Sequence, residues 1–231
     1  MIYYRPTDGD PITQKINYRP RTCFLMTKLG KRVPQVVSEI RYRLTTFLVT
    51  NGVPVIDASH TLTGKDFLLK IWNIILSVPL GIAIVDKSMN SSTLSNIFYE
   101  VGLMQAYGKE TLIIKTKGTK IPSDLVRTEY LEFDETFEGE LKKYLYSLLE
   151  LADHYETLAD QLENNPLLAI DFLRRSYLIS GDEMLQDKAN SIYATYANEA
   201  PMLRNINNCV EKLLAAFSVP PLGKKSVVKS I

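Results

Sequence analysis

The chain has 231 residues with 27 basic and 26 acidic side chains, so its formal net charge is +1. Apolar residues make up 45% and charged residues 23%, which excludes a collagen-like, disordered or disulfide-framework protein. With two histidines and two cysteines, the sequence does not indicate a metal site built from these residues, and direct nucleic-acid binding is not expected at this charge.

Neither a secretory signal nor a membrane-spanning run is visible in the sequence. The first 15 residues lack an apolar core, and the longest apolar runs fall far short of the roughly 20 residues that span a bilayer. We therefore expect a cytoplasmic protein with no membrane contact and with reduced cysteines. Cys23 and Cys209 are interpreted as small core residues rather than reactive thiols.

Apolar periodicity predicts alternating strands and helices between residues 22 and 133. The expected strands are residues 22–27, 53–58, 80–86, 111–116 and 129–133, the last of them at the sheet edge. The expected helices are residues 34–50, 65–78 and 94–107, with a turn or short helix at 121–128. Strands alternating with helices pair in parallel through right-handed crossovers, so this order predicts a flavodoxin-like, doubly wound five-stranded parallel sheet.

From Phe137 onward the pattern predicts helices only, with breaks at Asn164-Asn165-Pro166 and Gly181. The expected divisions are an N-terminal extension (1–21), an α/β domain (22–134), an all-helical domain (135–218) and a basic tail (219–231). Leucine and tyrosine stripes in the helical domain are typical of a core. Such a module could also assemble a homo-oligomer or hold a regulatory protein partner.

The two parts differ in charge. Residues 1–133 carry 17 basic and 11 acidic side chains, whereas residues 134–231 carry 10 basic and 15 acidic ones. The first part is therefore the better place for an anionic ligand. The alternative interpretation is that the second part is simply a set of solvated acidic helices.

Ligands of open α/β sheets bind outside the carboxyl ends of the strands. That rule directs attention to the loops after Thr27, Asp57, Asp86 and Thr116. The sequence lacks the glycine-rich phosphate loops, the nucleophile elbow of hydrolases and the HExxH motif. With so few histidines and cysteines, any catalysis is expected to depend on carboxylates, hydroxyls or amides.

The segment from Asn90 to Lys109 carries the candidate catalytic group. A hydroxyl-rich loop enters the expected helix 94–107, and Glu100 lies near its start, with Asn96 one turn earlier on the same side. A carboxylate near a helix N-terminus is favoured in its ionised form, and there it can stabilise or attack a developing sugar cation. A glutamate that merely complements the helix dipole would occupy the same position.

The stretch NIFYEVGLMQAYGKETLIIK resembles the signature shared by nucleoside 2-deoxyribosyltransferases and TIR-like domains. In those families a helix of the form F/Y-E-[LIV]-G-x-x-x-A-x-G-K carries the catalytic glutamate, which falls on Glu100 here. The segments CFLMT, IDAS, GKDFLLKIW and PSDLVRTEY look like bacterial TIR-like proteins of this superfamily.

The resemblance implies an enzyme that cleaves or exchanges an N-glycosidic bond in NAD or a related nucleotide, without a cofactor or metal. It also implies a role in bacterial anti-phage defence. Nicotinamide leaves NAD as a neutral base and requires no general acid, whereas a purine or pyrimidine normally requires one. Asp86 is the nearest candidate acid. The alternatives are a nucleoside deoxyribosyltransferase, an enzyme that makes a cyclic nucleotide signal, and a catalytically silent nucleotide-binding or assembly module.

Other residues complete the expected site. Thr27 and Lys28 could contact ribose or phosphate, or simply form a surface loop. Asp57, followed by Ser59, could bind a ribose hydroxyl or cap the next turn. Tyr99 could stack on a base or belong to the core.

Three side chains are expected to have no role in the site. Trp72 is interpreted as a core residue, His60 as a surface histidine, and Arg127 as the partner of a neighbouring carboxylate.

Overall fold

The computed structural model describes residues 3–12, 16–30, 32–61, 67–125, 128–162, 165–199 and 210–218. Contacts divide the chain into two compact units. Residues 21–146 form one, here called the α/β unit, and residues 1–20 with 147–221 form the other, here called the helical unit. The sequence predicted a division after residue 134, whereas the contacts place it inside helix α4 (Phe137–Asp160).

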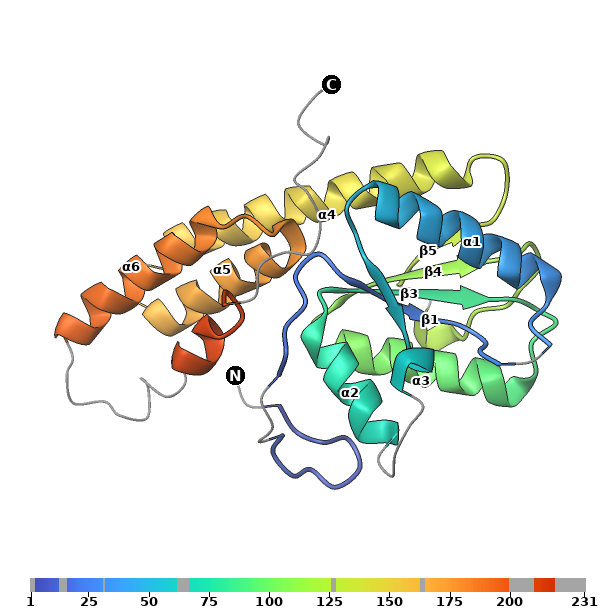
Figure 1. Cartoon of the computed structure of the whole chain (residues 1–231), viewed down its shortest axis with the longest axis horizontal. Helices are drawn as coiled ribbons and strands as arrows, with labels where there is room; N and C mark the ends of the chain where they lie inside the picture. The colour runs from blue at the N-terminus through green and yellow to red at the C-terminus, as the bar shows by residue number, and fades with distance from the viewer. Residues whose placement is uncertain are drawn as a thin grey trace. The chain divides into compact units, whose positions relative to one another are not determined.

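The α/β unit is built on a five-stranded, all-parallel sheet with strand order β2-β1-β3-β4-β5, which confirms the flavodoxin-like doubly wound fold (Figure 1). The strands are β1 (Cys23–Met26), β2 (Val55–Asp57), β3 (Leu80–Val85), β4 (Glu110–Lys115) and β5 (Glu129–Glu132). Every residue of β3 is buried, as expected for a central parallel strand covered on both faces.

Helices cover both faces of the sheet in Figure 1. Helix α1 (Gln35–Thr50) lies on one face together with the first turns of α4, and Arg43 of α1 donates to Glu138 of α4 at 2.9 Å. Helices α2 (Phe67–Ser77) and α3 (Ser91–Ala106) pack against each other on the opposite face. Two short 3-10 turns, Ala58–Thr61 and Ser123–Leu125, complete the connections.

Helix α3 begins three residues before the position that the sequence predicted. The side chain of Asn90 accepts a hydrogen bond from the backbone N–H of Thr93 at 2.8 Å, so Asn90 is the N-cap and Ser91 the first helical residue. The hydroxyl-rich segment therefore belongs to the helix rather than to a loop. This shift changes the position of Glu100 along the helix.

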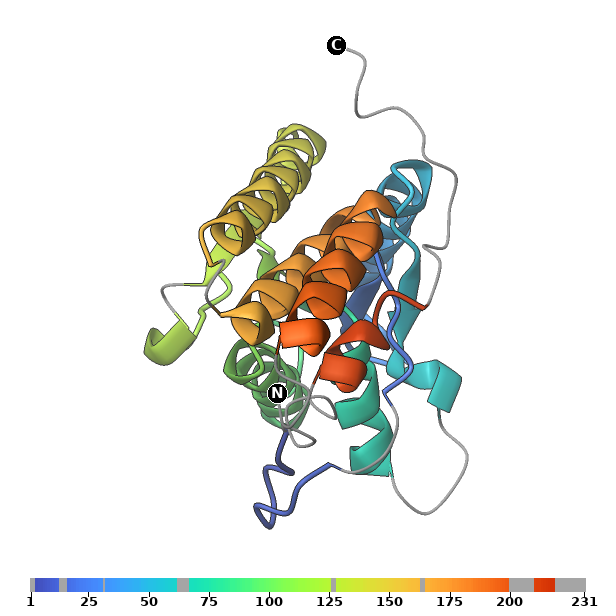
Figure 2. The ribbon, with the colours of Figure 1, turned by 90° about the vertical axis from the view of Figure 1, so that its left-hand side faces the viewer.

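The helical unit contains the hairpin formed by α5 (Pro166–Ser180) and α6 (Met184–Glu199), which pack side by side in both views (Figures 1 and 2). Gly181 ends α5 in the left-handed conformation, with φ of 68°. Residues 210–214 are also helical; most of the last predicted helix lies outside the described residues, as does the basic tail 219–231. Residues 3–20, predicted as an extension, belong to this unit.

Two predicted core residues of the α/β unit are confirmed. Cys23 is fully buried, which raises the pKa of its thiol far above the ordinary value, and Trp72 is 3% exposed. Cys209, Arg127 and the side chain of His60 lie outside the described residues. None of the described helices is both long and apolar enough to cross a bilayer.

Candidate functional site

The topological switch point of the sheet lies between β1 and β3. From this pair the chain continues outward to β2 on one side and to β4 on the other, so the connections after Met26 and Val85 run in opposite directions. Ligands of doubly wound sheets bind at such a point. Thr27 and Lys28 follow β1 directly, and Asp86 follows β3. The structure thus brings three of the predicted site residues to one edge of the sheet.

Thr27 provides an unsatisfied polar group at this edge. Its side chain is 9% exposed, and its hydroxyl oxygen has no hydrogen-bond partner among the described residues. Burying a hydroxyl without a partner is unfavourable, so native proteins rarely leave one. A ligand at the switch point could supply the missing partner. Lys28 beside it is partly exposed.

The carboxylate of Asp86, in contrast, accepts hydrogen bonds from other residues of the protein. Its carboxylate accepts from the backbone N–H of Ser88 at 2.8 Å and from the hydroxyls of Ser88 and Thr116. Burial by itself would raise the pKa of Asp86, but the hydrogen bonds from Ser88 and Thr116, together with Lys87, lower it below the ordinary value. An ionised carboxylate that accepts three hydrogen bonds is a poor proton donor, which argues against Asp86 as a general acid.

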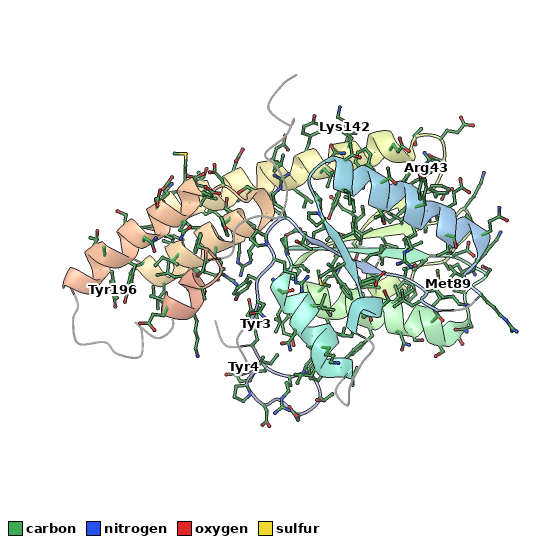
Figure 3. All side chains as sticks on the ribbon, in the orientation of Figure 1. Tyr3, Tyr4, Arg43, Met89, Lys142 and Tyr196 are labelled. Atoms are coloured by element: carbon green, nitrogen blue, oxygen red, sulfur yellow. The ribbon has the colours of Figure 1, made fainter. Side chains whose placement is uncertain are left out.

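The network around Asp86 joins two loops of the carboxyl edge. Thr119 contacts the Thr116 hydroxyl at 2.9 Å and accepts from the backbone N–H of Lys87 at 3.0 Å. Met89, labelled in Figure 3, is buried in the same loop, and its backbone N–H donates to the carbonyl of Asp86. The loop that leads into α3 is therefore held in one conformation.

Asp57 lies apart from this network. It ends β2, which is separated from β3 by β1. Its carboxylate accepts from the backbone N–H of Ser59 at 2.9 Å and from the Ser59 hydroxyl, and it pairs with Arg41 of α1. Of the two sequence-based interpretations, the turn cap is the one that these hydrogen bonds match.

Glu100 does not lie near the start of its helix, and this expectation was wrong. It is the tenth residue of α3, about 14 Å along the axis from Ser91, and the first turn contains no acidic residue. Met104, one turn further, reaches the beginning of β3, because a Cβ added at Gly81 would lie 2.7 Å from its end. Residues four apart share one side of a helix, so Glu100 lies on the same side of α3 as Met104 and one turn closer to the start of the helix.

The environment of Glu100 makes the ionised form less favourable than it is for an exposed glutamate. Its side chain is partly buried, and burial raises the pKa to about 7 from an ordinary 4.5. The helix dipole argument therefore does not apply, because its effect is confined to the first turn. At neutral pH both the protonated and the ionised form of Glu100 are populated. A carboxyl group poised in this way is typical of sites that accept or donate protons.

The other two α3 candidates are exposed. Asn96 lies one turn before Glu100, and Tyr99 is 45% exposed, so the core interpretation of Tyr99 was wrong. Successive helical residues point about 100° apart, so Tyr99 does not share a face with Glu100.

Some residues that shape this edge were not predicted. Ser88 and Thr119 hold Asp86 and its loop, and Arg41 holds Asp57. Gly118, with φ of 79°, marks the turn that carries Thr119 and was the available signal in the sequence. Arg41 and Asp57 are 16 residues apart, so no local sequence pattern indicates that they pair.

Within the described residues, no group of three or more histidine, cysteine, aspartate or glutamate side chains is arranged to hold a metal ion. The chain matches no protein-family model and no curated protein.

Proposed function

We propose that the protein is an N-glycosidase that cleaves the bond between ribose and nicotinamide in NAD or a related nucleotide, with Glu100 as the catalytic carboxylate. The observation that carries this proposal is the partly buried Glu100 carboxyl, with its pKa raised to about 7, on the helix that leaves the switch point. Its match to the helix glutamate of TIR-like enzymes and deoxyribosyltransferases is the second support.

The chemistry requires one carboxylate and water. As the C1′–N bond breaks, nicotinamide departs with the bonding electron pair as a neutral base, and positive charge develops on the ribose. Ionised Glu100 would stabilise that charge, and a water molecule would add its hydroxyl to C1′ and release a proton. Because the same desolvation that raises the pKa also strengthens the attraction between opposite charges, partial burial suits this role.

NAD is favoured over a nucleoside substrate because of Asp86. Exchange of a purine or pyrimidine calls for a general acid, and Asp86, the nearest candidate, has a lowered pKa and hydrogen bonds that are met within the protein. Nicotinamide needs no such proton. Thr27, whose hydroxyl lacks a partner among the described residues, and Lys28 would contact the ribose or phosphates.

The remaining parts of the proposal come from the resemblance. A helical region joined to an NAD-consuming unit would assemble protomers or hold a regulatory partner, which restrains a toxic activity until infection. In that role the protein would be an effector of bacterial anti-phage defence, acting within the cytoplasm.

The decisive experiment uses the purified chain and a Glu100→Gln variant, each incubated with NAD, ADP-ribose and deoxynucleosides. Chromatography with mass detection measures nicotinamide, free base and any cyclic product. The matched control is Glu39→Gln, because Glu39 is an exposed glutamate on another helix of the same unit. We expect nicotinamide release by the parent chain and by the control, and its loss in Glu100→Gln.

Equal activity in Glu100→Gln would refute the assigned mechanism. Transfer of deoxyribose between bases would identify a deoxyribosyltransferase, and a cyclic product would identify a signal-producing enzyme. Thermal stabilisation by NAD or ADP-ribose without any turnover, with and without candidate partners, would identify a silent binding module.

A further inference from the structure

One guanidinium group holds the N-terminal segment of the helical unit at two points. Nη1 of Arg174 on α5 donates to the hydroxyl oxygens of Tyr3, at 3.3 Å, and Tyr18, at 3.2 Å. Both tyrosines are buried, and the guanidinium lies 5.7 Å from the centre of the Tyr18 ring. Figure 3 labels Tyr3 at the beginning of this segment. We call residues 3–12 and 16–20 the N-terminal strap.

Arg174 is itself held by a buried carboxylate. Asp171 accepts from Nη2 of Arg174 at 2.6 Å and from Nε of Arg175 at 3.0 Å. Burial by itself would raise the pKa of Asp171, but the two arginines lower it, so the carboxylate stays ionised. We call the contacts of Arg174 with Tyr3, Tyr18 and Asp171 the Arg174 clamp. Opening this clamp would leave a buried cation short of acceptors, so the closed and open arrangements are two distinct states.

The clamp is not completely satisfied. Nε of Arg174 is buried and has no hydrogen-bond partner among the described residues. A buried charged group with an unmet donor is less stable than one with every hydrogen bond in place. This contact is therefore suited to opening when another part of the protein or a partner supplies a better arrangement.

The strap continues into strand β1, which is paired on both sides, through an unusual backbone conformation. Arg21 has φ of 55°, a left-handed value that is unfavourable for a residue with a Cβ. Its guanidinium donates to the carbonyl of Asn51 at 3.2 Å, which holds the residue in place. Arg21 is also the first residue of the α/β unit, and β1 begins two residues later.

We propose that the N-terminal strap is a conformational link between the helical unit and β1. An event on the helical unit that opens the Arg174 clamp releases Tyr18, lets Arg21 leave its left-handed conformation, and loosens the backbone from Thr22 to Thr27. Through this continuous segment of the chain, a conformational change in the helical unit would alter the backbone at the switch point. It does not depend on the proposed enzymatic activity.

The test is amide hydrogen exchange, read by mass spectrometry, on a Tyr3→Phe/Tyr18→Phe double variant. This change removes both hydroxyl acceptors and keeps the aromatic rings. Loss of hydrogen bonds to a charged group predicts exchange of the amides from Ile16 to Arg19 that is roughly tenfold to hundredfold faster. The proposal further predicts faster exchange from Thr22 to Thr27. Tyr42→Phe, at a 73% exposed tyrosine of α1, is the control and should change neither segment.

A second variant separates the link from general loosening. Arg21→Gly removes the cost of the left-handed conformation, because glycine adopts it freely. It also removes the guanidinium bond to Asn51, but that bond holds an unfavourable conformation which glycine adopts without such support. When Arg21→Gly is added to the double variant, amide exchange in the strap should stay fast, and exchange of residues 22–27 should return to the rate of the parent chain. Two results for the double variant would overturn the proposal. One is faster amide exchange in the strap with no change in residues 22–27, and the other is no change of amide exchange in the strap.

Trp72 is the sole tryptophan of the chain and is buried in α2, so its fluorescence reports whether the α/β unit remains folded. Should the double variant fail to fold, Tyr3→Phe alone is used with the same two readouts and the same criteria.

Discussion

The hydroxyl of Thr116 at the end of β4 donates a hydrogen bond to the carboxylate of Asp86 at the end of β3. The two residues are 30 positions apart, and the parallel pairing of β3 with β4 brings them together. This contact decides the chemical character of Asp86: it is a stabilised anion that organises two loops.

Asp86→Asn is expected to destabilise the α/β unit by roughly 1.5–3 kcal/mol at pH 7, because hydrogen bonds to a charged acceptor are lost or weakened. Since the pKa of Asp86 is lowered in the folded state, its contribution is present above the unfolded pKa and is lost as pH falls through the folded one. Urea denaturation followed by Trp72 fluorescence measures the change. Glu39→Gln, at an exposed position of α1 in the same unit, is the control and should stay within about 0.5 kcal/mol.

Glu100→Gln is expected to stabilise the protein at alkaline pH. The folded-state pKa of Glu100 is above the ordinary 4.5, so the folded protein binds the proton more tightly and its stability falls as pH rises from 4.5 through about 7. The glutamine variant does not lose this stability. We expect it to be more stable by up to about 3 kcal/mol at pH 8, and by almost nothing at pH 4.5.

Denaturation curves of the parent chain, Glu100→Gln and Glu39→Gln at both pH values test this prediction. A stability difference for Glu100→Gln that does not change with pH would contradict it. The measurement is independent of any activity, so it tests the electrostatic environment of Glu100 by itself.

The proposed nicotinamide release should depend on pH through Glu100. The reaction needs the ionised carboxylate, so kcat/KM should rise with pH and level off above an apparent pKa of about 7. At pH 6 the value should be about tenfold below the plateau. Initial rates between pH 5 and pH 9 measure this profile. A rate that falls as pH rises through 7 would instead assign Glu100 the role of a general acid.

Gly81→Ala is expected to cost about 1 kcal/mol, because its Cβ would lie 2.7 Å from the end of Met104 and 2.8 Å from the end of Met26. Both atoms are the flexible ends of methionine side chains, which can move at moderate cost. Gly81→Val should cost more, and Met104→Leu should partly rescue Gly81→Ala.

Gly102→Ala on α3 is the matched control for Gly81→Ala. A Cβ at Gly102 would meet no atom within 4 Å, so alanine should stabilise the helix by about 0.5–1 kcal/mol. Thermal denaturation should therefore shift in opposite directions for the two glycines. Shifts of the same sign would show that packing of α3 on β3 is not what restricts Gly81.

Asn90→Ala should destabilise by about 1 kcal/mol, because it removes the side-chain oxygen that caps Thr93 at the start of α3. Ser92→Ala, at an exposed helical position next to it, should have little effect. Chemical denaturation compares the two. Equal losses would mean that Asn90 does not set the beginning of the helix.

The sequence of strands and helices and the parallel, doubly wound sheet class could be predicted because they follow from local patterns. The continuous apolar run of β3 and the helical spacing of Val37, Ile40 and Leu44 are visible in the sequence, and each lies buried as expected. The start of α3 was missed because an N-cap asparagine in a polar segment resembles a loop. The exposure of Tyr99 was missed because an aromatic at helical spacing usually packs inward.

The sequence by itself determined the parallel α/β architecture and supplied the pattern that singles out Glu100. Only the tertiary structure decided the ionisation of the carboxylates. Asp86 and Glu100 are both carboxyl groups of the α/β unit, yet the pKa of one is lowered by hydrogen bonds from residues up to 30 positions away, and the pKa of the other is raised by burial. Both effects depend on which side chains surround a group in space, and local sequence does not contain that information.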